Sequence, residues 1–196
     1  MLMVIPFDTM KTIQTSAVLL KEHEGQMSRL RLLKLLYIAD REAFAETRRP
    51  ITGDRIAAMD HGPVPSTTYN LLKGEHSAAV TWDQFIKQVG PQEHRLINDP
   101  GVGRLSRYEI EKLRSVSEQR REKNDYDIAL ETHGFEEWQR NKPPAGSRRW
   151  IPLDDILTAL NLEGSKQRIV DVMEDDAAFD AALASVRGKA AMPGLA

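Results

Sequence analysis

The chain has 196 residues and contains no cysteine. This absence excludes disulfide bonds, thiolate metal sites and cysteine nucleophiles, and it is typical of proteins from a reducing compartment. The sequence also lacks any apolar run close to the roughly 20 residues that a membrane helix needs. We therefore expect a cytoplasmic protein that has no membrane partner.

A strong charge of either sign is also missing. The formal net charge of −2 argues against a general affinity for the phosphate backbone of nucleic acids. Residues 151–196 carry 8 acidic and 4 basic side chains, so the acidic charge is concentrated at the end of the chain. Such an end could steer a basic partner toward the protein, although a solvated helix face explains it equally well.

The sequence lacks the usual nucleophile and phosphate-binding motifs. No serine occupies a strand-to-helix elbow of the Gly-x-Ser-x-Gly kind. The segment Gly101-Val-Gly103 lacks both the further glycine and the Lys-Ser/Thr pair of the known phosphate loops. We therefore expect no enzymatic activity of these kinds and no nucleotide cofactor.

A metal site is the remaining catalytic candidate, with Asp60, His61, His133 and Glu137 as the available ligand types. Adjacent side chains such as Asp60 and His61 tend to point apart. Between His133 and Glu137 lies Gly134, which is expected to break the helix that would align them. We therefore expect no metal and no other cofactor, although a metal-dependent hydrolase built on His61 and His133 stays as a weaker alternative.

Apolar content of 41% in a chain of this length predicts one main domain with an appendage. Ser28 is expected to cap a helix that runs to Pro50 and is apolar around most of its circumference. Such a helix belongs in the centre of a fold.

Caps and apolar spacing predict the other helices. They are a helix capped by Asp8, a helix from Ser66 to Gly74, a helix from Thr81 to Val89 that buries Trp82, a helix from Ser106 to about Lys123 with Glu109 in a capping box, a helix from Asp125 to His133, a turn at Phe135–Trp138, a helix at Asp154–Leu160 and a last helix capped by Ser165.

Two short segments are predicted to be strands. Arg55–Met59 follows a glycine turn, and His94–Ile97 is bounded by turn-forming residues, so we expect these two to pair. The fold class is therefore α+β, predominantly α-helical with a small antiparallel β hairpin.

Four segments in fixed order carry a family resemblance: Leu32–Phe44, Ala58–Tyr69, Leu105–Glu109, and Thr132-His133 followed by Trp138. Together they resemble the Panacea domain, also called the SocA-like antitoxin domain, from about Met27 to about Leu160. The resemblance implies a bacterial or phage antitoxin that neutralises a toxin by binding it directly. The toxin is expected to be encoded by an adjacent gene.

The resemblance also suggests how the chain is divided. We expect a SocA-like domain at 1–150, an acidic helical extension at 151–187 and a flexible tail at 188–196. Some members of the family act as adaptors between a toxin and an ATP-dependent protease. The final Leu195-Ala196 is similar to apolar tags that such proteases engage, so a protease is a second candidate partner.

The segment His61–Pro65 combines one glycine with two prolines, which predicts a rigid corner. Rigid corners suit recognition because they lose little entropy on binding. Trp150, in a turn-rich stretch, is the aromatic side chain that we expect to be exposed. The candidate partner-binding residues are Asp60, His61, Gly62, Pro63, Val64, Tyr69 and Trp150.

A DNA-binding regulator is the first alternative function. It would use basic clusters at Arg29, Arg31 and Lys34, at Arg48 and Arg49, at Arg120, Arg121 and Lys123, and at Arg140, Lys142, Arg148 and Arg149. Each cluster has acidic neighbours, which favours a solvated surface and makes nucleic-acid binding an unfavoured reading. His23, His76 and His94 are also expected at the surface.

Overall fold

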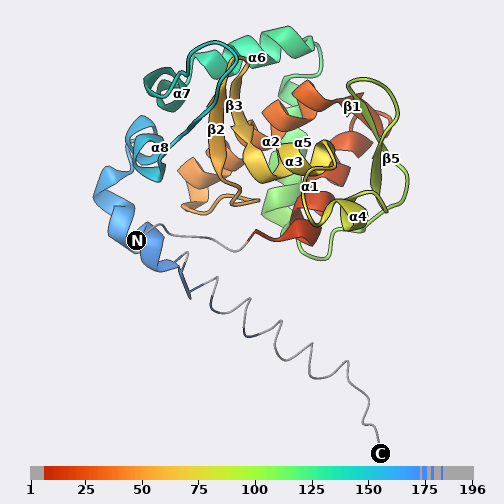
Figure 1. Ribbon diagram of the computed structural model, residues 1–196. Coiled ribbons are helices and arrows are strands. Elements are labelled where there is room, and N and C mark those ends of the chain that lie inside the picture. The colour runs from red at the N-terminus through yellow and green to blue at the C-terminus, as the bar shows by residue number, and fades with distance from the viewer. Residues whose placement is uncertain (1–6, 173, 176–177, 179–181, 183–196) are drawn as a thin grey trace, which may run out of the picture.

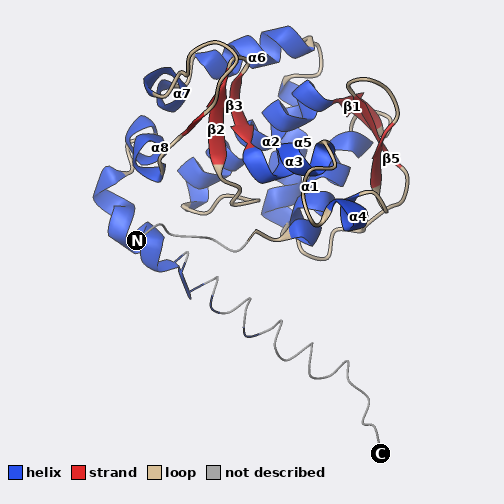
Figure 2. Cartoon of the chain, viewed as in Figure 1, coloured by secondary structure: helices blue, strands red, loops and turns tan. Residues whose placement is uncertain are grey.

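The computed structural model describes residues 7–172, 174–175, 178 and 182. The tail expected at 188–196 and the terminal Leu195-Ala196 lie outside them. Within these residues, helices predominate over two small antiparallel sheets, one of which lies at an edge of the molecule (Figures 1 and 2), which confirms a helix-dominated α+β fold. None of the described helices is both long enough and apolar enough to cross a membrane.

The first two helices begin at the predicted caps. The carboxylate of Asp8 accepts a hydrogen bond from Lys11 N at 2.9 Å at the start of α1 (Thr9–Lys21). The hydroxyl of Ser28 accepts one from Arg31 N at 3.0 Å at the start of α2 (Arg29–Thr47). Helix α2 lies in the middle of the domain, where α1, α5 and α6 pack around it (Figure 1).

The capping box is confirmed at the start of α5 (Arg107–Gln119), which ends before the predicted Lys123. Ser106 N donates to the Glu109 carboxylate at 2.7 Å, and Glu109 N donates to the Ser106 hydroxyl at 3.2 Å. The next helix, α6 (Asp125–His133), starts one residue after its cap, Asn124.

The remaining helical segments are short: α3 (Ser66–Leu72), α4 (Ala79–Trp82), α7 (Glu136–Arg140), α8 (Leu153–Ala159) and the 3₁₀ turn η1 (Glu163–Ser165), with helix continuing from residue 166. Ser66 does not cap α3 with its side chain. The buried carboxylate of Asp54 does so instead, because it accepts from Thr67 N at 2.9 Å and from Thr68 N at 2.8 Å. This long-range cap was not visible in the sequence.

The predicted strand pairing is wrong. One sheet has the order β3 (Gly62–Pro65), β2 (Ile56–Met59), β6 (Arg149–Trp150), and the other has the order β1 (Gln26–Ser28), β5 (Glu93–Leu96), β4 (Ile86–Gln88). Strand β2 thus pairs with the segment expected to be an isolated corner. The reason is that Gly62, with a φ of 100°, lets the chain reverse after two residues. Closing so short a loop costs little chain entropy.

The helix predicted from Thr81 to Val89 is also wrong, although Trp82 is buried as expected. The helix ends at Trp82, and Ile86–Gln88 forms an outer strand. Ile86 is buried while Val89 is 46% exposed, so the apolar spacing here does not mark one helix face. A short apolar run fits either structure, and pairing with β5 decided between them.

Several side chains expected at the surface are buried. His94 is 1% exposed, and its ring nitrogen Nε2 lies 3.1 Å from Leu72 O. Arg31 donates to the carbonyl oxygens of Arg120 and Lys123, and Lys34 and Arg120 are also buried. Two of the predicted basic clusters are therefore only partly at the surface, since Arg31 and Arg120 join α2 to the α5–α6 connection and Lys34 donates to Pro63 O.

Candidate functional site

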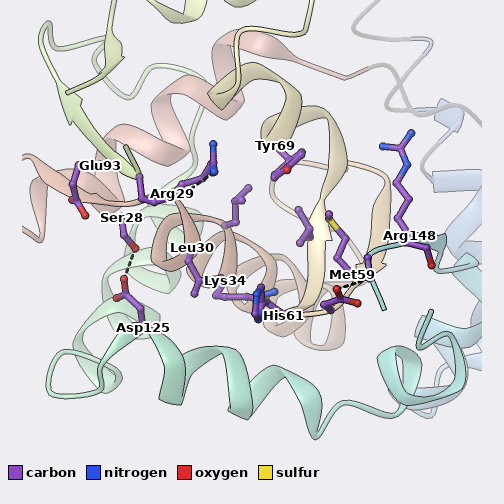
Figure 3. A pocket seen from close by; sticks show the side chains of 16 residues that line it. Ser28, Arg29, Leu30, Lys34, Met59, His61, Tyr69, Glu93, Asp125 and Arg148 are labelled. Carbon is purple, nitrogen blue, oxygen red and sulfur yellow. Dashed lines mark hydrogen bonds between the residues drawn. The ribbon is translucent and has the colours of Figure 1, made fainter. Parts of the chain in front are cut away.

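A pocket of about 810 Å³ opens beside the first turns of α2 (Figure 3). Its walls come from four parts of the chain: Ser28 and the first turns of α2, the β2–β3 hairpin, Tyr69 of α3, and the loop at 146–148. Gln92, Glu93 and Asp125 complete the lining. The volume is within the range of small-molecule and side-chain pockets.

The hairpin turn at this pocket is held from two sides. The Asp60 carboxylate accepts a hydrogen bond from Gly146 N at 2.7 Å, which ties the 146–148 loop to the turn. The indole of Trp138 donates to Met59 O at 3.0 Å from α7. Asp60 and His61 remain exposed at the tip. The turn is therefore a fixed projection with two accessible polar side chains.

Lys34 lies in the wall of the pocket and is fully buried. Its ammonium donates to Pro63 O at 2.8 Å, and in the described part of the chain it forms no ion pair. Burial lowers the pKa of Lys34 from 10.5 to about 7. Gly62 leaves the space for this ammonium, because a Cβ at that position would lie 2.9 Å from Nζ.

His133, at the end of α6, stacks on Trp138 with ring centroids 4.2 Å apart and planes 5° apart. Burial, followed by the nearby charge of Lys34, lowers the pKa of His133. Its Nε2 atom is buried without a hydrogen-bond partner. The motif residues from α6 and α7 thus form the support behind the hairpin.

Four of the seven candidate binding residues line the pocket: Asp60, His61, Val64 and Tyr69. Gly62 and Pro63 lie buried behind it. Trp150 does not line the pocket and is 41% exposed, with the guanidinium groups of Arg55 and Arg148 at 4.0 and 5.4 Å from its ring centroid. The structure therefore brings most, but not all, of the predicted set together.

Two of the residues considered as metal ligands from the sequence, Glu137 and Asp60, make other contacts. The Glu137 carboxylate is buried against Tyr37 and Arg41, while the Asp60 carboxylate accepts from the backbone of Gly146. Across residues 7–172 and the few described beyond them, no three His, Asp or Glu side chains are grouped closely enough to hold a metal ion.

Comparison with known families identifies the domain. The family model for the antitoxin SocA-like Panacea domain covers residues 32–139, more than half of the chain. The chain belongs to this family. No curated protein and no solved structure matches the chain. The family is one of antitoxins, which implies a toxin as partner in general terms.

The match runs from α2 to α7, so it contains Lys34, the whole β2–β3 hairpin and the His133–Trp138 stack. It excludes Trp150 and the 146–148 loop. The pocket is therefore built mainly by the matched region and completed by residues on both sides of it, 28–30 before it and 146–148 after it.

Lys34 and Arg148 line the pocket, although the sequence placed them only in basic clusters and not among the candidate partner-binding residues. One signal for Lys34 was present, since it is the single charged residue between Leu32 and Ala39 in an otherwise apolar stretch. A cation among apolar positions on all sides of a helix has no solvated face to occupy. For Arg148 the sequence showed only a basic cluster, because its place beside the pocket depends on the pairing of the adjacent β6 with β2.

The buried lysine predicts a pH-dependent stability. Since its folded pKa of about 7 lies below the unfolded value of 10.5, the unfolded state binds more protons between these values, and stability should rise with pH in that window. Lys34→Met lacks this titrating group. From pH 7 to pH 9 we therefore expect the unfolding free energy of the parent to rise by about 2 to 3 kcal/mol relative to that of Lys34→Met. Urea unfolding at each pH measures this difference. Parallel curves for the two proteins would contradict the burial of an unpaired ammonium.

Proposed function

We propose that this protein is an antitoxin that neutralises one toxin by direct binding in the cytoplasm, without catalysing a reaction. The observation that carries the proposal is the family match, whose residues include the projecting hairpin and most of the pocket around it. We further propose that the toxin binds over this pocket.

The surface has the composition of a binding site for a protein segment. Leu30, Leu33, Met59 and Tyr69 supply apolar contact area in the pocket, and the Asp60-His61 tip supplies polar groups at its edge. Beside the pocket, Trp150 offers a large side chain between two guanidinium groups. Tryptophan and arginine are the residue types most enriched among those that dominate binding energy.

The two alternatives receive less support from the geometry. Arg31, Lys34 and Arg120 could not contact DNA, because these cations are buried in contacts inside the domain. A hydrolase would need a catalytic set, and His133 is stacked on Trp138 rather than grouped with carboxylates. Delivery of the toxin to an ATP-dependent protease rests on the family resemblance alone.

Co-expression with the adjacent gene tests the proposal. We expect the neighbouring product to stop growth when expressed alone, and growth to be restored with a co-purifying complex when this protein is present. An interface of standard size would bury roughly 1,600 Å² in total. A harmless neighbour, or a neighbour that stays toxic and never binds, would contradict the proposal.

The site is tested in the same assay with His61→Ala. Val64 is unsuitable for a charged substitution because it is buried in the core. His61 is exposed, so His61→Ala should keep the thermal midpoint within a few degrees while weakening neutralisation. Lys87→Ala, at an exposed position on β4, is the matched control and should neutralise like the parent.

A further inference from the structure

We propose that the pocket receives an aspartate or glutamate side chain of the toxin and that the Lys34 ammonium forms the ion pair with it. This inference rests on the function proposed above and names the chemistry of its partner. It follows from the state of Lys34 in the unbound protein, from the charges around it and from its position in the pocket.

The first argument is the unmet bonding capacity of Lys34. An ammonium group has three donors, and the described residues offer it one acceptor, Pro63 O. Lysine is almost never fully buried unless it is paired, because an unpaired buried charge is unfavourable. A carboxylate arriving from a partner would supply both the missing charge and further acceptors.

The second argument is that the pocket's own carboxylates are already engaged or distant. Asp60 accepts from Gly146 N, and Asp125 accepts from Ser28 and Arg31. Glu93 lies on the side of the pocket away from Lys34 (Figure 3). None of the three forms an ion pair with Lys34 within the described chain.

The other titratable groups near this part of the pocket are His133 on α6, whose pKa is lowered by burial and then by the charge of Lys34, and His61 on the turn, which lines the pocket. Arg29 and Arg148 add two cations to the pocket lining. The carboxylates Asp60, Glu93 and Asp125 balance these two cations and Lys34 in the lining as a whole, but none of them pairs with the ammonium in the described chain. An acidic side chain that reaches the ammonium would therefore gain an attraction that a basic one would not.

The third argument is access. Figure 3 shows Lys34 extending from α2 toward the turn that carries His61. His61 is exposed and occupies a two-residue turn, so it can change rotamer without disturbing the core. A partner side chain that enters the pocket beside this turn would approach the ammonium, which lies in the pocket wall.

Pairing should also change the protonation of Lys34. Burial holds the pKa of the free protein's Lys34 at about 7, so much of this side chain is neutral at pH 8. A carboxylate within ion-pair distance raises the pKa of an ammonium. Formation of the complex at pH 8 should therefore take up close to one proton.

The test with the toxin compares the parent with Lys34→Met, which keeps the length of the side chain and removes its charge. We expect at least a 30-fold loss of affinity for the purified product of the adjacent gene, with no fall in thermal midpoint at pH 7. Calorimetry of the parent complex in two buffers of different ionisation enthalpy should show the proton uptake, and Lys34→Met should abolish it. Lys87→Met is the matched control and should bind like the parent. Unchanged affinity of Lys34→Met would overturn the proposal.

A second test uses the parent protein alone, without the toxin and without any substitution. In the parent protein with ¹³C-labelled lysine, the Lys34 pKa is measured by NMR in acetate and in chloride at equal ionic strength. We expect acetate to raise the Lys34 pKa, and an equal pKa in both salts would overturn recognition of a carboxylate. If the neighbouring product fails to bind any form of the protein, the proposed function fails, and the acetate titration still decides the chemistry of the pocket.

Discussion

Gly62→Ala should destabilise the protein by about 3 kcal/mol or more. A Cβ at this position would lie 2.4 Å from Thr132 Oγ1 and 2.9 Å from Lys34 Nζ, closer than real Cβ atoms approach any neighbour. The φ of 100° is also unfavourable for any residue with a Cβ. Overpacking and backbone strain each contribute roughly 1–3 kcal/mol. Chemical denaturation measures the loss, and the hairpin should lose its alignment with α6.

The matched control for Gly62→Ala is Gly101→Ala. Gly101 has a φ of 68°, but no atom lies within 4 Å of the position that its Cβ would occupy. Only backbone strain should remain, at about 1–2 kcal/mol. An equal loss of stability at the two positions would show that the close approach of Lys34 and Thr132 to the hairpin does not matter.

Glu137→Ala should lower the free energy of unfolding by about 3–5 kcal/mol, because it removes one partner from a buried ion pair. The Glu137 side chain has no exposed surface, and it accepts from Tyr37 Oη at 2.5 Å and from Arg41 Nε at 2.7 Å. Burial, and then the charge of Glu137, raises the pKa of Tyr37, so the phenol stays protonated and donates. The variant would leave a phenol and a guanidinium without their acceptor. Equilibrium unfolding in urea measures the effect.

The neighbouring residue provides the control for this second substitution. Glu136 pairs with Arg140 one turn along α7 at 3.1 Å, and its side chain is 63% exposed. Exposed pairs of this spacing contribute little, so Glu136→Ala should change stability by less than about 0.5 kcal/mol. A mild effect of Glu137→Ala, comparable to that of Glu136→Ala, would contradict the role of Glu137 in joining α2 to α7.

Local sequence signals determined the helices that have strong caps. Asp8, Ser28 and Ser106 were each assigned correctly because a cap bonds a backbone amide only a few residues away. The central position of α2 also followed from the sequence, since a helix that is apolar on all sides has no face for water. The ordered motifs were enough to indicate the family, which the match over residues 32–139 bears out.

The strand pairing and the interior of the pocket depended on tertiary structure. The sequence marked Arg55–Met59 as a strand, but the choice of partner depended on the φ of Gly62 and on the packing of α2 and α6 against the hairpin. The division of the chain at residue 150 and the binding role of the seven candidate residues stay predictions.

Buried charge was the other feature that the sequence did not determine. Glu137 looks like an ordinary surface residue when its neighbours along the chain are counted, and the apolar neighbours of Lys34 indicate burial without indicating what encloses the ammonium. Lys34 is enclosed by the β3 backbone and by side chains near residue 133, and Glu137 receives its partners from about 100 residues earlier. Burial and pKa depend on distances in space, and only the folded chain brings those atoms together.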